Sequence, residues 1–332
     1  MITEKIGNIT VIMGKNNSRV PFSTSLVIES KEADVLIDCG GGAEVFQHLK
    51  KEFQIRSLYL THYHLDHVFG AYLFKDEATI HINPYDYLKL NDPFELAKSS
   101  GMAGTRDKNE LEKWINKFIK KNKPLNPDRP LWEPIIGIAD CTYPYEKTIN
   151  LSGTNMIMLH TPGHTEGFCC PYFPEQGVLF AGDYDLTSFG PWYNNADSDI
   201  DEFIQSSKRT LETDAKYFVT SHHKGWRSRD EYEKGLTAYI EKIYEREEKV
   251  RLSIQNGVSP EEIVHKGIFY FVENHLKNPN LMISEIVGIA KHIQRLIKQG
   301  YQYEDYSIEF MSHFNLTQEA IEYRSLPYYV TG

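Results

Sequence analysis

The sequence contains few cysteines, no long apolar run and no excess of positive charge. Its four cysteines form no Cys-X-X-Cys pair and show no spacing typical of a disulfide framework. We therefore expect buried, unpaired thiols and a cytoplasmic location. No stretch approaches 18 apolar residues, and residues 1–10 lack the basic and then apolar pattern of a signal peptide, so neither a membrane span nor a leader is predicted.

Acidic residues outnumber basic ones by 46 to 36, which gives a formal net charge of −10. A negatively charged chain repels a polyanion, so nucleic acid is a disfavoured partner and a small-molecule substrate is expected. The 332 residues, 41% of them hydrophobic, predict a globular protein with one large and one smaller domain. A homodimer is left open.

Short β-branched and apolar runs alternate with helical patterns in the first two thirds of the chain. This order is typical of a layered α/β fold, in which the loops at strand ends carry the chemistry. We expect strands at 22–29, 33–37, 56–60, 156–159, 178–180 and 216–220, and helices at 43–53 and 199–212.

Residues 84–141 interrupt this pattern. Leu111, Trp114, Ile115 and Phe118 form an apolar stripe that predicts a helix over 108–121, and a proline-rich stretch follows. The segment is too long for a plain connection, so we interpret it as a cap inserted into a catalytic domain of residues 1–226.

Residues 227–332 are predicted to form a helical C-terminal domain. Ser228 with Glu231 matches a capping box, and Pro260 after Ser259 starts a second helix. A third helix covers 281–299 and is closed by a glycine. For the earlier helix over 199–212, we expect Ser198 and Asp201 to form the N-terminal cap pair.

The densest chemical signal lies in Thr61-His62-Tyr63-His64-Leu65-Asp66-His67, directly after a predicted strand. Residues two apart in extended backbone point the same way, so His62 and His64 can bind one ion, while Asp66 and His67 face a neighbouring one. Imidazole and carboxylate without thiolate suit Zn, Fe or Mn.

Three further candidate ligands follow at later strand ends. His164 lies in a Pro-Gly-His-Thr turn, Asp183 follows a glycine that permits close backbone approach, and His222 follows a small residue. We favour His222 over its neighbour His223. Three other histidines lack such a context and are expected to be structural or exposed: His48, His81 and His160.

In residue type, order and context, these motifs resemble the metallo-β-lactamase superfamily over residues 9–226. The resemblance implies a four-layered αββα sandwich, here with a helical cap and a C-terminal helical extension. It also implies a binuclear site with two divalent ions, zinc foremost, in which His62, His64 and His164 bind one ion, Asp66, His67 and His222 bind the other, and Asp183 bridges them. Asp38 looks like the family's buried aspartate that orients a metal-bound histidine.

A hydroxide shared by two metal ions attacks a carbonyl carbon or a phosphorus, and Asp66 is the expected catalytic residue that orients it and passes its proton. We expect hydrolysis of a small ester, thioester or lactone, as in glyoxalase II-like or lactonase-like enzymes. A phosphodiesterase or nuclease and a mononuclear iron persulfide dioxygenase are the alternatives. Phe189, Trp192 and Tyr193 either line a substrate pocket or pack beneath the loop after Asp183.

Overall fold

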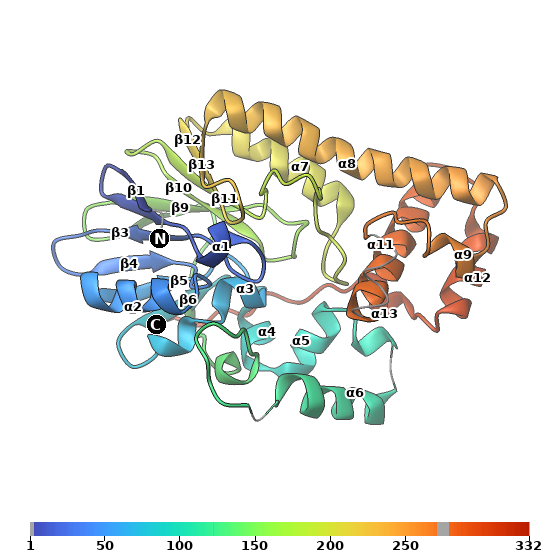
Figure 1. Cartoon of the computed structure of the whole chain (residues 1–332), viewed down its shortest axis with the longest axis horizontal. Coiled ribbons are helices and arrows are strands. Elements are labelled where there is room, and N and C mark those ends of the chain that lie inside the picture. The colour runs from blue at the N-terminus through green and yellow to red at the C-terminus, as the bar shows by residue number, and fades with distance from the viewer. Residues whose placement is uncertain (1–2, 106, 122, 271–278, 332) are drawn as a thin grey trace.

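Two mixed β-sheets packed face to face form the centre of the molecule (Figure 1). The computed structural model describes residues 3–105, 107–121, 123–270 and 279–331. The first sheet follows chain order: β1 Thr3–Ile6, β2 Ile9–Ile12, β3 Ser25–Ile28, β4 Asp34–Ile37, β5 Ile55–Tyr59, β6 Thr79–Ile82 and β7 Cys141–Thr142. The second has the order β13-β12-β11-β10-β9-β8, with β8 Thr148–Asn150, β9 Asn155–His160, β10 Cys169–Phe173, β11 Val178–Gly182, β12 Tyr217–Thr220 and β13 Trp226–Ser228.

Alternation of side chains along the strands produces four layers. In β4, Val35 and Ile37 join a core between the two sheets, whereas Leu36 faces the opposite way, toward helix α2 (Ala43–Glu52). The outer face of the second sheet is covered by α7 (Ile200–Arg209) and the long helix α8 (Arg229–Gln255). The predicted αββα sandwich is therefore confirmed.

The remaining helices lie to one side of the sandwich (Figure 1). The segment after β6 carries α4 Tyr87–Asn91, α5 Pro93–Ser99, α6 Lys108–Trp114 and a π-helical turn, Ile115–Ile119. Further on are α9 Pro260–Ile263, α11 Pro279–Lys298, α12 Glu304–His313 and α13 Gln318–Ile321; the short helices α1 Lys15–Ser18 and α3 Leu65–Val68 lie beside the sheets. The domain boundaries at 84–141 and 226 stay predictions.

Residues 322–331, here called the tail, return in extended form from the helical side to the sheets (Figure 1). The amide of Tyr328 donates to the carbonyl of Pro84 at 2.8 Å, and the carbonyl of Val330 accepts from the amide of Thr142 at 2.9 Å. The tail thus ties the end of the described chain to the cap and to strand β7.

The helix ends show where local sequence decides structure. The capping box predicted at Ser228 is present, and the helix predicted to start at Pro260 begins with a second capping box at Ser259. The predicted N-terminal cap of α7, Ser198 with Asp201, was wrong. The side chain of Asp199 caps the helix and accepts from the Glu202 amide at 2.9 Å. The physical reason is tertiary, because the hydroxyl of Ser198 donates instead to the carbonyl of His164 at 2.8 Å.

All four cysteines are buried and free, as predicted. The cytoplasmic location that they suggested stays a prediction. Among the helices in the described ranges, none combines the length and the apolar character needed to cross a bilayer.

Candidate metal centre

Loops at one edge of the two sheets bring the predicted site residues together. His62 follows β5, His164 follows β9, and Asp183 directly follows β11, while His222 lies two residues beyond β12. Strands β4 and β5 are parallel, as are β11 and β12, so their carboxyl ends open toward the same edge. Residues as far apart in sequence as His62 and His222 thus meet in one cluster.

The seven predicted ligands form two groups, and within each group the possible ligand atoms lie within 4.8 Å of one another. We call these seven residues the histidine cluster. Asp183 contacts both groups, with Oδ2 at 3.1 Å from His164 Nε2 and Oδ1 at 3.0 Å from His67 Nε2. The first group holds His62, His64, His164 and Asp183, and the second holds Asp66, His67 and His222.

Each histidine uses its outer ring nitrogen to bind the surrounding protein. The Nδ1–H of His67 donates to Asp38 Oδ2 at 2.7 Å, so Asp38 orients His67 as expected for the family. The Nδ1–H of His222 donates to the carbonyl of Ser18 at 2.9 Å, and the Nδ1–H of His164 donates to that of Trp192 at 2.9 Å.

Four inner atoms of the cluster have no protein partner of hydrogen-bonding geometry. These buried atoms are Nε2 of His62, His67 and His222 and Oδ1 of Asp183. Buried polar atoms are nearly always paired, and imidazole nitrogens with carboxylate oxygens are the donor set that Zn²⁺ and similar ions prefer. The residues present therefore fit a divalent metal.

The electrostatics of the cluster keep two of its rings neutral and its central carboxylate ionised. Burial lowers the pKa of His62 and of His64 well below the usual histidine value, and neighbouring histidines lower it further, so both rings are neutral near pH 7. Burial would raise the pKa of Asp183, but His67 and His164 hold it well below the usual range. Asp183 is therefore an anion between neutral and cationic rings.

Two glycines allow the loops to approach this closely. A Cβ on Gly40 would lie 1.6 Å from the carbonyl oxygen of Asp66, so only glycine lets the loop after β4 support the Asp66 backbone. Gly163 has φ +126°, and a Cβ there would lie 2.1 Å from the amide nitrogen of Phe203. Both turns hold residues of the cluster in place.

The four histidines that the sequence analysis set aside lie outside the cluster. His223 follows His222 in left-handed backbone (φ 59°) and is half-buried. The ring of His81 stacks on Tyr59 with centroids 4.3 Å apart, and that of His160 stacks on Tyr145 at 4.2 Å. His48 packs edge-on against a phenylalanine.

The aromatic residues after Asp183 divide between the two interpretations. The Trp192 ring lies beside His64 and His164, with centroids 5.2 and 5.9 Å apart. Tyr193 is fully buried in the core under α7, whereas Phe189 is 38% exposed. Only Trp192 adjoins the cluster directly.

A second buried polar group, here called the Lys89 cluster, lies close to the histidines. The ammonium of Lys89 contacts Asp197 at 2.7 Å, Asp86 at 2.9 Å and Glu166 at 3.8 Å. The hydroxyl of Tyr63, inside the His-X-His-X-Asp-His segment, donates to Asp197 at 3.2 Å. No pattern in the sequence marked this group, because its members come from four separate segments.

Comparison with known proteins identifies the fold family. The family model described as "Metallo-beta-lactamase superfamily" matches residues 19–222. The chain belongs to the metallo-beta-lactamase superfamily. As members of this superfamily do, it binds divalent metal through His and Asp side chains and is a metal-dependent hydrolase.

Three superfamily relatives have measurable sequence similarity. An uncharacterized protein of Aquifex aeolicus is 26% identical over 58% of this chain and 79% of its own length. A hydroxyacylglutathione hydrolase of Haemophilus influenzae is 29% identical over 48% of this chain, and a human acyl-coenzyme A thioesterase is 23% identical over 56%. The chain spans 64% and 66% of the length of these last two proteins.

Solved structures extend the likeness over the whole fold. A metallo-beta-lactamase family protein of Thermus thermophilus has a TM-score of 0.59 at 16% identity, covering 88% of this chain and 94% of its own. A beta-lactamase domain protein of Burkholderia ambifaria has a TM-score of 0.60 at 14% identity, covering 90% and 89%. At these identities the likeness supports the fold alone.

Proposed function

We propose that the histidine cluster holds two divalent ions, zinc foremost, and that the enzyme hydrolyses a small thioester, ester or lactone. The observation that carries the proposal is a set of four buried inner atoms that make no hydrogen bond, in two groups that Asp183 joins. One carboxylate within reach of both groups is the arrangement that a bridged pair of metal ions requires.

When bound, such ions acidify a water molecule and polarise the oxygen of a substrate carbonyl. The protein then orients that water and removes its proton. Asp66 is placed for this task, since its side chain is 19% exposed against 9% for Asp183, and its Oδ2 lies 3.5 Å from His222 Nε2. We assign Asp66 the role of proton acceptor.

The relatives favour acyl transfer from a thiol. An acylated glutathione and an acyl-coenzyme A are both thioesters, and the two named relatives act on them. The Trp192 ring beside His64 offers an apolar surface to an acyl group. The names of these relatives put thioesters first among the three proposed classes.

The first test is the metal content of protein purified without added metal, measured by elemental analysis. We expect two zinc ions per chain. A single iron per chain with oxygen uptake in the presence of a persulfide would contradict the hydrolase and support the dioxygenase.

The second test is the substitution Asp66→Ala with aryl thioesters, esters and lactones as substrates. Because the proton acceptor is lost, we expect kcat to fall by about 10²–10⁴-fold and the metal content to drop below two. His81→Ala is the matched control, since this ring stacks on Tyr59 away from the cluster and its loss should leave kcat within about 2-fold. Full activity in Asp66→Ala, or activity confined to aryl phosphodiesters, would refute the proposal.

A further inference from the structure

The loop of residues 191–198 touches two of the metal-binding histidines on the side that faces away from the cluster. Its Trp192 carbonyl accepts from His164 Nδ1 at 2.9 Å, and its Ser198 hydroxyl donates to the His164 carbonyl at 2.8 Å. The Asn195 amide nitrogen, Nδ2, lies 3.0 Å from His64 Nε2. The same His64 ring turns Nδ1 toward His164 Nε2, 2.9 Å away inside the cluster.

We propose that Asn195 is a positioning residue that holds His64 ready for metal, and that the C-terminal helices set this contact by fixing the 191–198 loop. The proposal rests on the metal site proposed above. His64 differs from the other histidines because it presents Nδ1, not Nε2, to the cluster, so it needs a partner for Nε2. Rotation of the carboxamide lets Asn195 accept from Nε2–H, which leaves Nδ1 unprotonated for a metal ion.

Asn195 is itself fixed by buried neighbours. In the orientation described, Asn195 Nδ2 donates to the hydroxyl of Tyr63 at 2.8 Å, and Tyr63 donates to Asp197 at 3.2 Å. After the rotation, Tyr63 donates its proton to Asn195 Oδ1 instead, and Asp197 keeps the proton that Lys89 donates at 2.7 Å. The neighbouring Lys89 cluster thus limits the carboxamide to two orientations.

The C-terminal helices hold both ends of the loop through main-chain atoms. At its start, the buried Arg246 of α8 donates to the carbonyl of Pro191 at 2.5 Å. At its end, the buried Lys291 of α11 donates to the carbonyls of Ser198 and Ile321, both at 2.6 Å. Between them, the Asn194 side chain donates to a carbonyl of α11 at 2.8 Å.

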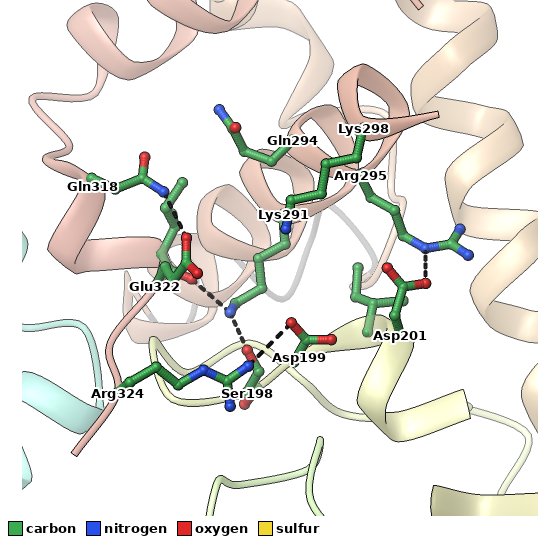
Figure 2. A pocket seen from close by; sticks show the side chains of 12 residues that line it. Ser198, Asp199, Asp201, Lys291, Gln294, Arg295, Lys298, Gln318, Glu322 and Arg324 are labelled. Atoms are coloured by element: carbon green, nitrogen blue, oxygen red, sulfur yellow. Dashed lines mark hydrogen bonds and ion pairs between the residues drawn. The ribbon is translucent and has the colours of Figure 1, made fainter. Parts of the chain in front are cut away.

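Figure 2 shows the joint at Lys291, where α11 and α13 meet the start of α7. The neighbouring charges are paired across the joint, with Arg295 to Asp201 at 2.8 Å and Arg324 to Asp199 at 3.3 Å. The Lys291 side chain extends past these pairs to the Ser198 carbonyl of the loop. Burying a cation is costly, and here it fixes the backbone of a loop that touches the histidine cluster.

The experiment measures zinc affinity by competition with a chromogenic chelator and the visible spectrum of the Co²⁺-loaded protein. We expect Asn195→Ala to lower the affinity for one of the two zinc ions by about 10–100-fold and to shift the Co²⁺ spectrum. Asn195→Asp keeps an acceptor for Nε2–H and should restore both readouts. Asn91→Ala is the matched control, because this carboxamide donates to the Ala139 carbonyl outside the loop and should leave them unchanged.

The role of the C-terminal helices is tested with Lys291→Met. Like Asn195→Ala, this variant should bind zinc more weakly, while its far-UV circular dichroism spectrum stays native. Unchanged affinity in Lys291→Met would overturn the role of the C-terminal helices. Unchanged affinity in Asn195→Ala, or no rescue by Asn195→Asp, would overturn the role of Asn195. Absence of zinc binding in the wild-type protein would instead refute the proposed function, so the two failures are distinguishable.

Discussion

The molecule buries two polar clusters side by side, and they differ in whether their polar atoms have hydrogen-bond partners. In the Lys89 cluster, the ammonium and its nearest carboxylates are paired with one another within 2.9 Å. In the histidine cluster, four inner atoms have no protein hydrogen bond, although their rings are fixed from outside. Full pairing marks a structural scaffold, whereas convergent unpaired atoms mark a place for a ligand.

The largest effect is expected when the side chain shared by the two groups of the histidine cluster is removed. We expect Asp183→Ala to lower hydrolase activity on the order of 10³-fold, because both predicted metal sites lose a carboxylate. Zinc content should fall from two ions to one or none. Retention of two tightly bound zinc ions would contradict the bridging role of Asp183.

The Lys89 cluster should respond in stability rather than in metal content. Lys89→Met leaves three buried carboxylates without their cation, which we expect to cost about 3–5 kcal/mol of unfolding free energy, measured by urea denaturation. Lys5→Met is the control, since the Lys5–Glu29 pair is solvent-exposed and its loss should cost below about 1 kcal/mol. Equal losses in the two variants would show that the buried network is no scaffold.

A smaller paired group, around Glu247 between α8 and α11, should make the stability of the fold depend on pH. Burial would raise the pKa of Glu247, but the His292 ring 3.5 Å away and a hydrogen bond from Arg295 lower it to about 2. A carboxyl with a lowered folded-state pKa stabilises the fold above its unfolded value, 4.5, and that contribution is lost as pH falls toward 2.

Glu247→Gln should therefore cost on the order of 2–3 kcal/mol near neutral pH, and the difference from wild type should shrink below pH 4.5. Unfolding of the chelator-treated proteins at several pH values measures this effect without interference from bound metal. A difference that does not change with pH would contradict the pairing.

The two-sheet fold and the seven clustered residues could be predicted because motifs at successive strand ends resemble the metallo-beta-lactamase superfamily, and that resemblance implies both. Local patterns supplied the starting points: apolar and β-branched runs marked strands, and the dense segment from His62 to His67 marked an edge where loops meet. The capping box at Ser228 was predicted equally directly, since it depends on residues only three apart.

What escaped prediction depends on contacts between distant segments. The acceptors for His164 and His222 are main-chain carbonyls, which every residue possesses and no motif announces. Asn195 is an ordinary loop asparagine until the fold places it beside His64. The cap of α7 moved to Asp199 because the neighbouring serine has a partner 34 residues away.

The tail has a consequence for the order in which the molecule assembles. Its contacts with Thr142 and Tyr85 span 188 and 240 residues. During synthesis from the N-terminus, the cap emerges from the ribosome long before the segment that ties it down. Because closing so long a loop is slow, we expect the sandwich to consolidate first and the cap to gain its final protection from hydrogen exchange in a late, separate kinetic phase.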